Sequence, residues 1–103
     1  AEVDVVLAPT TAITAPTVED IADGSDYFEA NMALLRNTAP GNLLELCAVT
    51  VPLALDDNKM PVGLQVIAPY GEDERALSAA CAIENALGTM RDRHGLPPLW
   101  SDR

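Results

Sequence analysis

The chain has 103 residues, of which 49% are hydrophobic and 21% are charged, so it can form one small domain with a single modest core. Its formal net charge of −10 comes from sixteen acidic and six basic residues, which provide no basic stripe for nucleic-acid phosphates. Because no run of roughly 18 apolar residues is present, the composition also predicts no membrane-spanning helix. We therefore expect neither nucleic acid nor a membrane as a partner.

Two features bear on the compartment in which the protein works. The first residues, AEVDVVLAPTT, lack a basic start, a long apolar stretch and a small-residue cleavage site, so no secretion signal is predicted. Cys47 and Cys81 lie in apolar runs and not in a C-x-x-C spacing, which is typical of reduced, buried thiols. A disulfide between them stays open as an alternative. We expect a cytoplasmic protein.

The first part of the chain predicts a strand followed by a long connection. Val3 to Ala8 is a nearly unbroken apolar run that stops at Pro9, a pattern typical of a strand buried on both faces. Residues 12–24 include Pro16 and Gly24, which favour a loop or an extended connection over a regular element.

A helical pattern begins at Ser25 or Asp26. Asp26 as the N-cap and Glu29 three positions later resemble a capping box, and an apolar face recurs at Phe28, Met32 and Leu35. We expect this helix to end between residues 37 and 41. A second short helical turn is expected over residues 42–47.

The middle of the chain predicts an antiparallel hairpin. Residues 48–55 and 62–68 are apolar runs, and the polar cluster at residues 56–59 is typical of a chain reversal. Pro52 has no N–H to donate to a sheet, which predicts an edge position or a bulge. Gly63 indicates a bulge or a close approach of two backbone segments.

Residues 72–87 carry the clearest helical pattern. Acidic residues occupy the first turn, and Gly88 is a suitable residue to follow the last one. The tail over residues 91–103 is expected to be an irregular arm. The predicted apolar face of the helix consists of Ala76, Leu77, Ala80, Cys81, Ile83 and Leu87.

The predicted order of elements is roughly β-α-β-β-α, which indicates the α/β class. Strands that are apolar on both sides need helices on both faces of their sheet. One clear helix and one weaker helix can hardly cover both faces of three strands. The chain is therefore predicted to be part of a larger sheet whose packing partners lie outside it.

The residues themselves predict no catalytic group, metal site or cofactor. One histidine and two separated cysteines do not make a metal site, and the six glycines never take the spacing of a phosphate-binding loop. No potential nucleophile or base lies in a recognisable catalytic motif. The residues considered were Ser25, Ser78, Ser101, Cys47, Cys81, His94 and Lys59.

Three segments, in this order, resemble the C-terminal region of the amidase-signature family. They are DVVLAPTTAITAP (residues 4–16), RNTAPGNLLELCAVTVPLAL (residues 36–55) and MPVGLQVIAPYGEDERALSAACAIENAL (residues 60–87). The third segment is the most specific of them. The family includes bacterial amidases, allophanate hydrolases and glutamyl-tRNA amidotransferases, in which one of the subunits is the family member.

The resemblance implies that residues 1–103 are the C-terminal segment of an amidase-signature domain, a large mixed sheet flanked by helices. The family hydrolyses a carboxamide C–N bond with a serine nucleophile, assisted by a second serine and a lysine. These residues lie in an earlier glycine- and serine-rich region, which nothing in this sequence matches. Lys59 falls in the hairpin turn and is not expected to be that lysine. The chain alone is thus predicted to be inactive.

The role that the resemblance leaves to this chain is scaffold and substrate-pocket wall. Thr10, Thr11 and Ile13 follow the first strand, at the kind of position where open α/β sheets bind ligands. Asn37 and Thr38 form a second candidate set. The expected partners are the remainder of the amidase domain and a small-molecule amide. An alternative is a stand-alone, non-catalytic interaction module that pairs with itself or another protein through its exposed sheet face.

Overall fold

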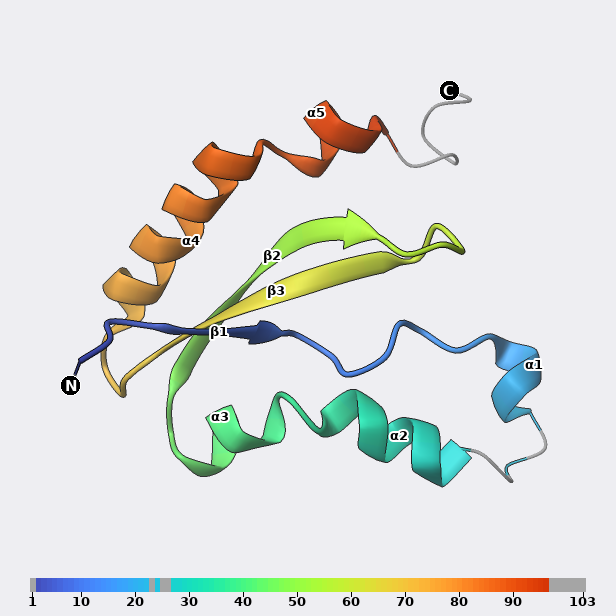
Figure 1. The fold of residues 1–103 in the computed structure, drawn as a ribbon. Helices are drawn as coiled ribbons and strands as arrows, with labels where there is room; N and C mark the ends of the chain where they lie inside the picture. Colours follow the sequence, from blue (N-terminus) through green and yellow to red (C-terminus); the bar gives the residue numbers. More distant parts are fainter. Residues whose placement is uncertain (1, 23, 25–26, 97–103) are drawn as a thin grey trace.

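The structure, a computed structural model, describes residues 2–22, 24 and 27–96 (Figure 1). Its strands are β1 (Val6–Pro9), β2 (Cys47–Leu55) and β3 (Pro61–Ala68), which form one antiparallel sheet in the order β1-β3-β2. Its longer helices are α2 (Tyr27–Leu35) and α4 (Asp73–Leu87). Figure 1 shows α4 on one side of the sheet and α2 on the other. The predicted α/β class is confirmed.

The core lies between α4 and the strands β2 and β3. Val66 of β3 is fully buried and packs with Val51 of β2 and Ala80 of α4. Ala76, one helical turn before Ala80, is also buried, so small side chains bring the helix backbone close to the sheet. The predicted helix face is confirmed in its centre. Leu77, Cys81 and Leu87, predicted on the same face, are exposed because α4 turns only its narrow alanine stripe to the strands.

The hairpin forms as predicted, with β2 at the edge of the sheet. Pro52 pairs with Gly63 and Ala54 pairs with Val62, so Leu53 is an extra residue in β2 and makes a bulge. Pro52 thus occupies an edge strand beside a bulge, where its missing N–H costs little. Arg93 donates hydrogen bonds to the carbonyl groups of Pro52 and Leu53, which gives these edge acceptors a partner.

Two short helices lie where the sequence predicted irregular chain. They are α1 (Val18–Ile21), inside the expected connection, and α5 (Met90–His94), inside the expected arm. Each begins with a capping box in which an aspartate takes the usual place of glutamate: Thr17 pairs with Asp20, and Thr89 pairs with Asp92. Those predictions were wrong because the caps outweigh the weak helix preference of such short segments. Pro97, Pro98 and Trp100 lie outside the described residues.

The helices before the hairpin are shifted from their predicted positions. The first, α2, ends at Leu35, and its predicted caps, Ser25 and Asp26, lie outside the described residues. The second is α3 (Ala39–Leu43), not the turn predicted over residues 42–47. It starts earlier because Pro40 fits the first turn of a helix, where no N–H is needed.

Large apolar side chains remain exposed, on β1 above all. Val6 and Leu7 are 53% and 52% exposed, although the sequence predicted a strand buried on both faces. Burial fails there because α4 packs mainly on β2 and β3. The total accessible surface is 7766 Å², against about 5,600 Å² expected for a compact monomer of this mass. The radius of gyration is 15.8 Å, against about 13 Å for a compact domain of this length.

The two cysteines are free, so the disulfide alternative is not realised. The Sγ of Cys47 is half-buried and donates to the carbonyl oxygens of Ala68 and Pro69, at 3.6 and 3.2 Å. Cys81 is exposed on α4, so the prediction of a buried thiol is wrong for that residue.

The hairpin turn depends on one carboxylate, and this gives a pH-dependent expectation. Asp56 Oδ1 accepts hydrogen bonds from the N–H groups of Met60 and Asn58, at 2.9 and 2.8 Å. The bond from Met60, more than any other contact, lowers the pKa of Asp56 below its ordinary value. A lowered pKa in the folded state means that the stabilisation is present above the unfolded pKa, about 3.9, and is lost as the pH falls through the folded pKa.

We expect the Met60 amide signal in an NMR pH titration to move with a midpoint below about pH 3.9. The Asp56→Asn variant should abolish that movement, whereas Asp57→Asn, the neighbouring control, should leave it unchanged. A midpoint at or above the ordinary aspartate value would contradict this role of Asp56 in the turn.

Candidate functional site

The face of the sheet opposite α4 is polar and hollow. Because strand neighbours point to opposite faces, Gln65 lies on the other side of β3 from the core residue Val66. Thr50 of β2 is the register partner of Gln65, so the two side chains share this face. Thr10, just after β1, completes the row. A cavity of about 260 Å³ lies above them, which we call the threonine hollow. It is lined by Thr10, Thr38, Gly41, Asn42, Leu46, Ala48, Thr50 and Gln65.

Backbone contacts position the threonines. The N–H of Thr10 donates to the carbonyl of Gly63 at 3.0 Å, which fixes the end of β1 to β3. The hydroxyl of Thr10 then donates to Thr50 Oγ1 at 3.2 Å, across the central strand. These two side chains can meet only because Gly63 lies between them: a Cβ there would be 2.8 Å from Thr50 Cγ2 and 2.9 Å from Thr10 Oγ1. The predicted close approach at Gly63 is confirmed.

The opposite wall of the threonine hollow comes from α3. Gly41 is buried there, and a methyl group on it would lie 4.0 Å from Gln65 Nε2. Thr38, at the start of α3, donates its hydroxyl to the carbonyl of Leu35 at 3.3 Å. A second, larger recess of about 590 Å³ shares Gly41, Asn42 and Leu46 with the hollow and extends past α3 toward Tyr70.

The predicted site residues separate into two groups. Thr10 and Thr38 line the threonine hollow. Asn37 lies next to it, where its side-chain amide donates to the carbonyl of Pro9 at 3.0 Å and ties the start of α3 to the end of β1. Thr11 and Ile13 do not join them. The hydroxyl of Thr11 donates to the carbonyl of Ile13 at 2.7 Å, and Ile13 lines a separate groove against α2.

Gln65 is the residue of this site that the sequence pattern did not predict. Its side chain is only 4% exposed, and its Oε1 is buried with no hydrogen-bond partner. A buried carbonyl oxygen without a partner is unusual, because losing its hydrogen bonds to water costs about 1–3 kcal/mol. The signal that could have found it is a single glutamine inside an apolar strand, Leu64-Gln65-Val66.

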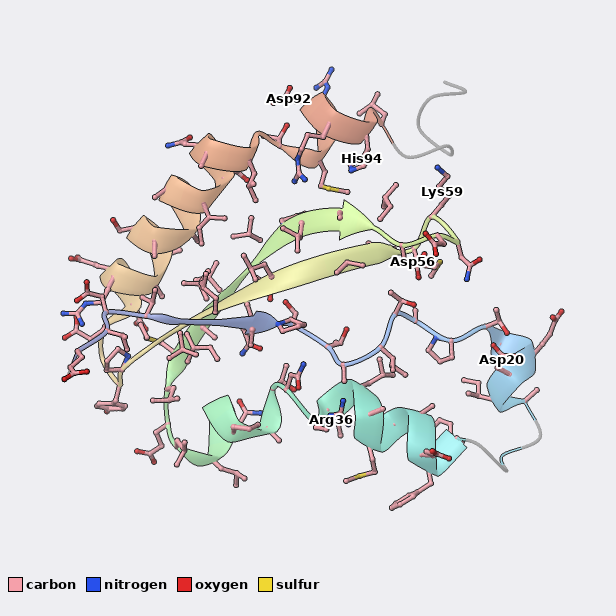
Figure 2. The ribbon with its side chains drawn as sticks, in the orientation of Figure 1. Asp20, Arg36, Asp56, Lys59, Asp92 and His94 are labelled. Atoms are coloured by element: carbon pink, nitrogen blue, oxygen red, sulfur yellow. The ribbon has the colours of Figure 1, made fainter. Side chains whose placement is uncertain are left out.

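The ionisable residues do not gather into a catalytic cluster. Figure 2 shows Lys59 at the hairpin tip near Asp56, and His94 on α5, away from α3 and its hollow. Among residues 2–22, 24 and 27–96, no group of three histidine, cysteine, aspartate or glutamate side chains could hold a metal ion. None of the helices described is long and apolar enough to cross a membrane.

Comparison with known proteins adds a family to this geometry. The family model described as Amidase matches residues 1–77. The chain is 42% identical over 98 residues to the 2-amino-5-chloromuconic acid deaminase of Comamonas testosteroni, covering 95% of this chain and 21% of that protein. It is 36% identical over 94 residues to a fatty acid amide hydrolase of Medicago truncatula, covering 89% of this chain and 16% of that protein.

A third relative belongs to the glutamyl-tRNA(Gln) amidotransferase of Halothermothrix orenii, of which it is one subunit. It is 30% identical over 90 residues, covering 87% of this chain and 18% of that protein. The chain thus spans about a fifth or less of the length of these relatives. No solved structure matches the chain.

Proposed function

Because the chain belongs to the amidase family, we propose that it is the C-terminal segment of an enzyme that hydrolyses carboxamide C–N bonds. The observation that carries the proposal is the match of residues 1–77 to the family, together with 42% identity to one relative along 95% of the chain. The nucleophilic serine, its partner serine and the lysine are supplied by a part of the enzyme outside this sequence. Residues 1–103 supply scaffold and pocket wall.

The exposed surface supports a partner for this segment. The accessible area exceeds that of a compact monomer by roughly 2,000 Å², and the uncovered residues include Val6 and Leu7 of β1 and Phe28 of α2. An exposed apolar surface of this size is costly in water and marks an interface. The remainder of the amidase domain is the partner that the family relationship favours.

Within that enzyme, the threonine hollow is proposed to form part of the wall of the amide-binding pocket. Its lining offers hydroxyl and carboxamide groups in an otherwise apolar frame, which is the ordinary make-up of a small-molecule site. A cytoplasmic location and a neutral amide substrate complete the proposal. Thr11 and Ile13, which lie outside the hollow, would act on the substrate only through the position of the loop that follows β1.

The test is release of ammonia from a panel of primary amides, from acetamide to long-chain fatty acid amides. The protein assayed is the full-length product of the reading frame that encodes this chain, with the 103-residue chain as the control. We expect hydrolysis by the full-length protein and none by the chain. Inactivity of the full-length protein on every amide would contradict the proposal.

Lys59 gives a further prediction for the full-length enzyme. The residue lies in the hairpin turn with φ of +65°, a backbone conformation that glycine adopts more easily, and its side chain is exposed. Lys59→Gly should therefore leave the rate of amide hydrolysis within about twofold of the wild-type rate, as exposed substitutions usually do. Loss of hydrolysis in this variant would show that Lys59 belongs to the catalytic machinery.

A second candidate is a stand-alone interaction module without catalytic activity, which the exposed apolar surface of β1 and α2 also favours. In that case the 103-residue chain should form a stable oligomer, measured by size-exclusion chromatography with light scattering. A stable monomer that binds no hydrophobic dye would count against a missing partner of either kind.

A further inference from the structure

The base of the threonine hollow holds an acceptor that the described part of the chain leaves without a donor. The Gln65 side chain is only 4% exposed, and its Oε1 has no hydrogen-bond partner. It lines the cavity from the central strand, where backbone pairing on both sides holds it in place. An unpartnered buried oxygen of this kind indicates that a hydrogen-bond donor is supplied by something that enters the hollow.

The lining restricts what that donor can be. None of the residues around the cavity carries a charge. An ammonium or guanidinium group would lose its hydration there with no opposite charge to replace it, and a carboxylate would lose its own in the same way. An uncharged N–H donor meets neither penalty.

The neighbouring hydroxyls favour a ligand that also accepts. Thr50 Oγ1 accepts the hydrogen bond from Thr10 at 3.2 Å, so the hydroxyl hydrogen of Thr50 remains free to donate to a ligand. A primary carboxamide presents an N–H donor beside a carbonyl acceptor. It therefore matches the Oε1 of Gln65 and the hydroxyl of Thr50 together.

We propose that Gln65 is a specificity residue that binds the carboxamide group of the substrate and discriminates it from the corresponding carboxylic acid. The inference rests on the proposed amidase function and adds to it the group that recognises the amide. An ionised acid would direct oxygen, not N–H, at the Gln65 oxygen and would bring an unpaired charge into an uncharged cavity. The product acid would thus leave as the amide enters.

The experiment measures ligand binding without turnover, by the thermal shift of the full-length protein with propionamide and with propionate. The variants are Gln65→Leu, which removes both amide atoms, and Asn58→Ala, which removes an exposed carboxamide at the hairpin tip as a control. We expect propionamide, and not propionate, to raise the unfolding temperature of the wild type and of Asn58→Ala. In Gln65→Leu the apparent affinity for propionamide should fall about five- to tenfold.

The unliganded proteins provide a second readout. Gln65→Leu should unfold at the wild-type temperature or above it, because it removes a buried oxygen that has no partner. Gln65→Met, which is unbranched like glutamine, repeats the test if leucine does not fit the cavity.

Four outcomes would overturn the inference. They are an unchanged affinity for propionamide in both Gln65 variants, equal binding of propionate, absence of a shift in the wild type, and a lower unfolding temperature of both variants without ligand. The last would show that another part of the protein is the partner of Gln65. Amide hydrolysis, measured separately, tests the proposed function: an inactive protein that still binds propionamide through Gln65 would refute only the hydrolase assignment.

Discussion

Replacing Gly63 with alanine is expected to destabilise the protein by about 1–3 kcal/mol and to disturb the threonine hollow in the same step. The added Cβ would lie 2.8 Å from Thr50 Cγ2 and 2.9 Å from Thr10 Oγ1, closer than such atoms approach in folded proteins. Gly63 is in the central strand, so its backbone cannot move away without breaking the pairing with β1 or β2. Both clashing threonines line the hollow, and at least one must leave its position.

The measurement is chemical denaturation of Gly63→Ala beside a matched control, Gly41→Ala. Gly41 is also buried at this cavity, but a Cβ there would meet only Gln65 Nε2, at the ordinary contact distance of 4.0 Å. Since Gly41 is in a helix, alanine should be neutral or stabilising by up to about 1 kcal/mol. Equal stability of the two variants would show that the approach of Thr10 and Thr50 at Gly63 is looser than described.

The second large effect is expected at the contact between α4 and the sheet. Ala80 packs on Val51 and Val66 in the core, so the indole of Ala80→Trp has no space unless the helix moves. We expect a loss of about 1–3 kcal/mol or more in the free energy of unfolding. The control is Glu84→Trp, which lies one turn later and is exposed.

Thermal unfolding of the two tryptophan variants compares an overpacked position with an exposed one on the same helix. A lower midpoint for Ala80→Trp alone is the expected result. If both variants unfolded at the wild-type temperature, α4 would not rest on the strands through its alanines.

The sequence was most informative where apolar pattern and turn chemistry agree. The hairpin, the edge position of Pro52 and the buried stripe of Ala76 and Ala80 were predicted because each depends on residues close in the chain. The short helices α1 and α5 were missed because aspartate replaced glutamate in their capping boxes. The exposure of β1 could not be predicted from its apolar run, because burial depends on what packs against the strand.

The site was predicted in part for a similar reason. Thr10 and Thr38 follow from the rule that ligands bind where strands end, and both line the hollow. Gln65 lies in mid-strand, and only the register with Thr50 shows which face it occupies. Thr11 and Ile13 were placed by chain proximity to Thr10, but the turn that Thr11 closes on the Ile13 carbonyl leads the chain away from the cavity.

The central claim is that this chain completes an amidase whose catalytic residues lie earlier in the same polypeptide. The most direct measurement is the coding sequence immediately upstream of Ala1. We predict an in-frame region, rich in glycine and serine, that carries two serines and a lysine suited to amide hydrolysis. A start codon directly before Ala1, with no such region in frame, would contradict the claim and direct the search to a separate protein partner.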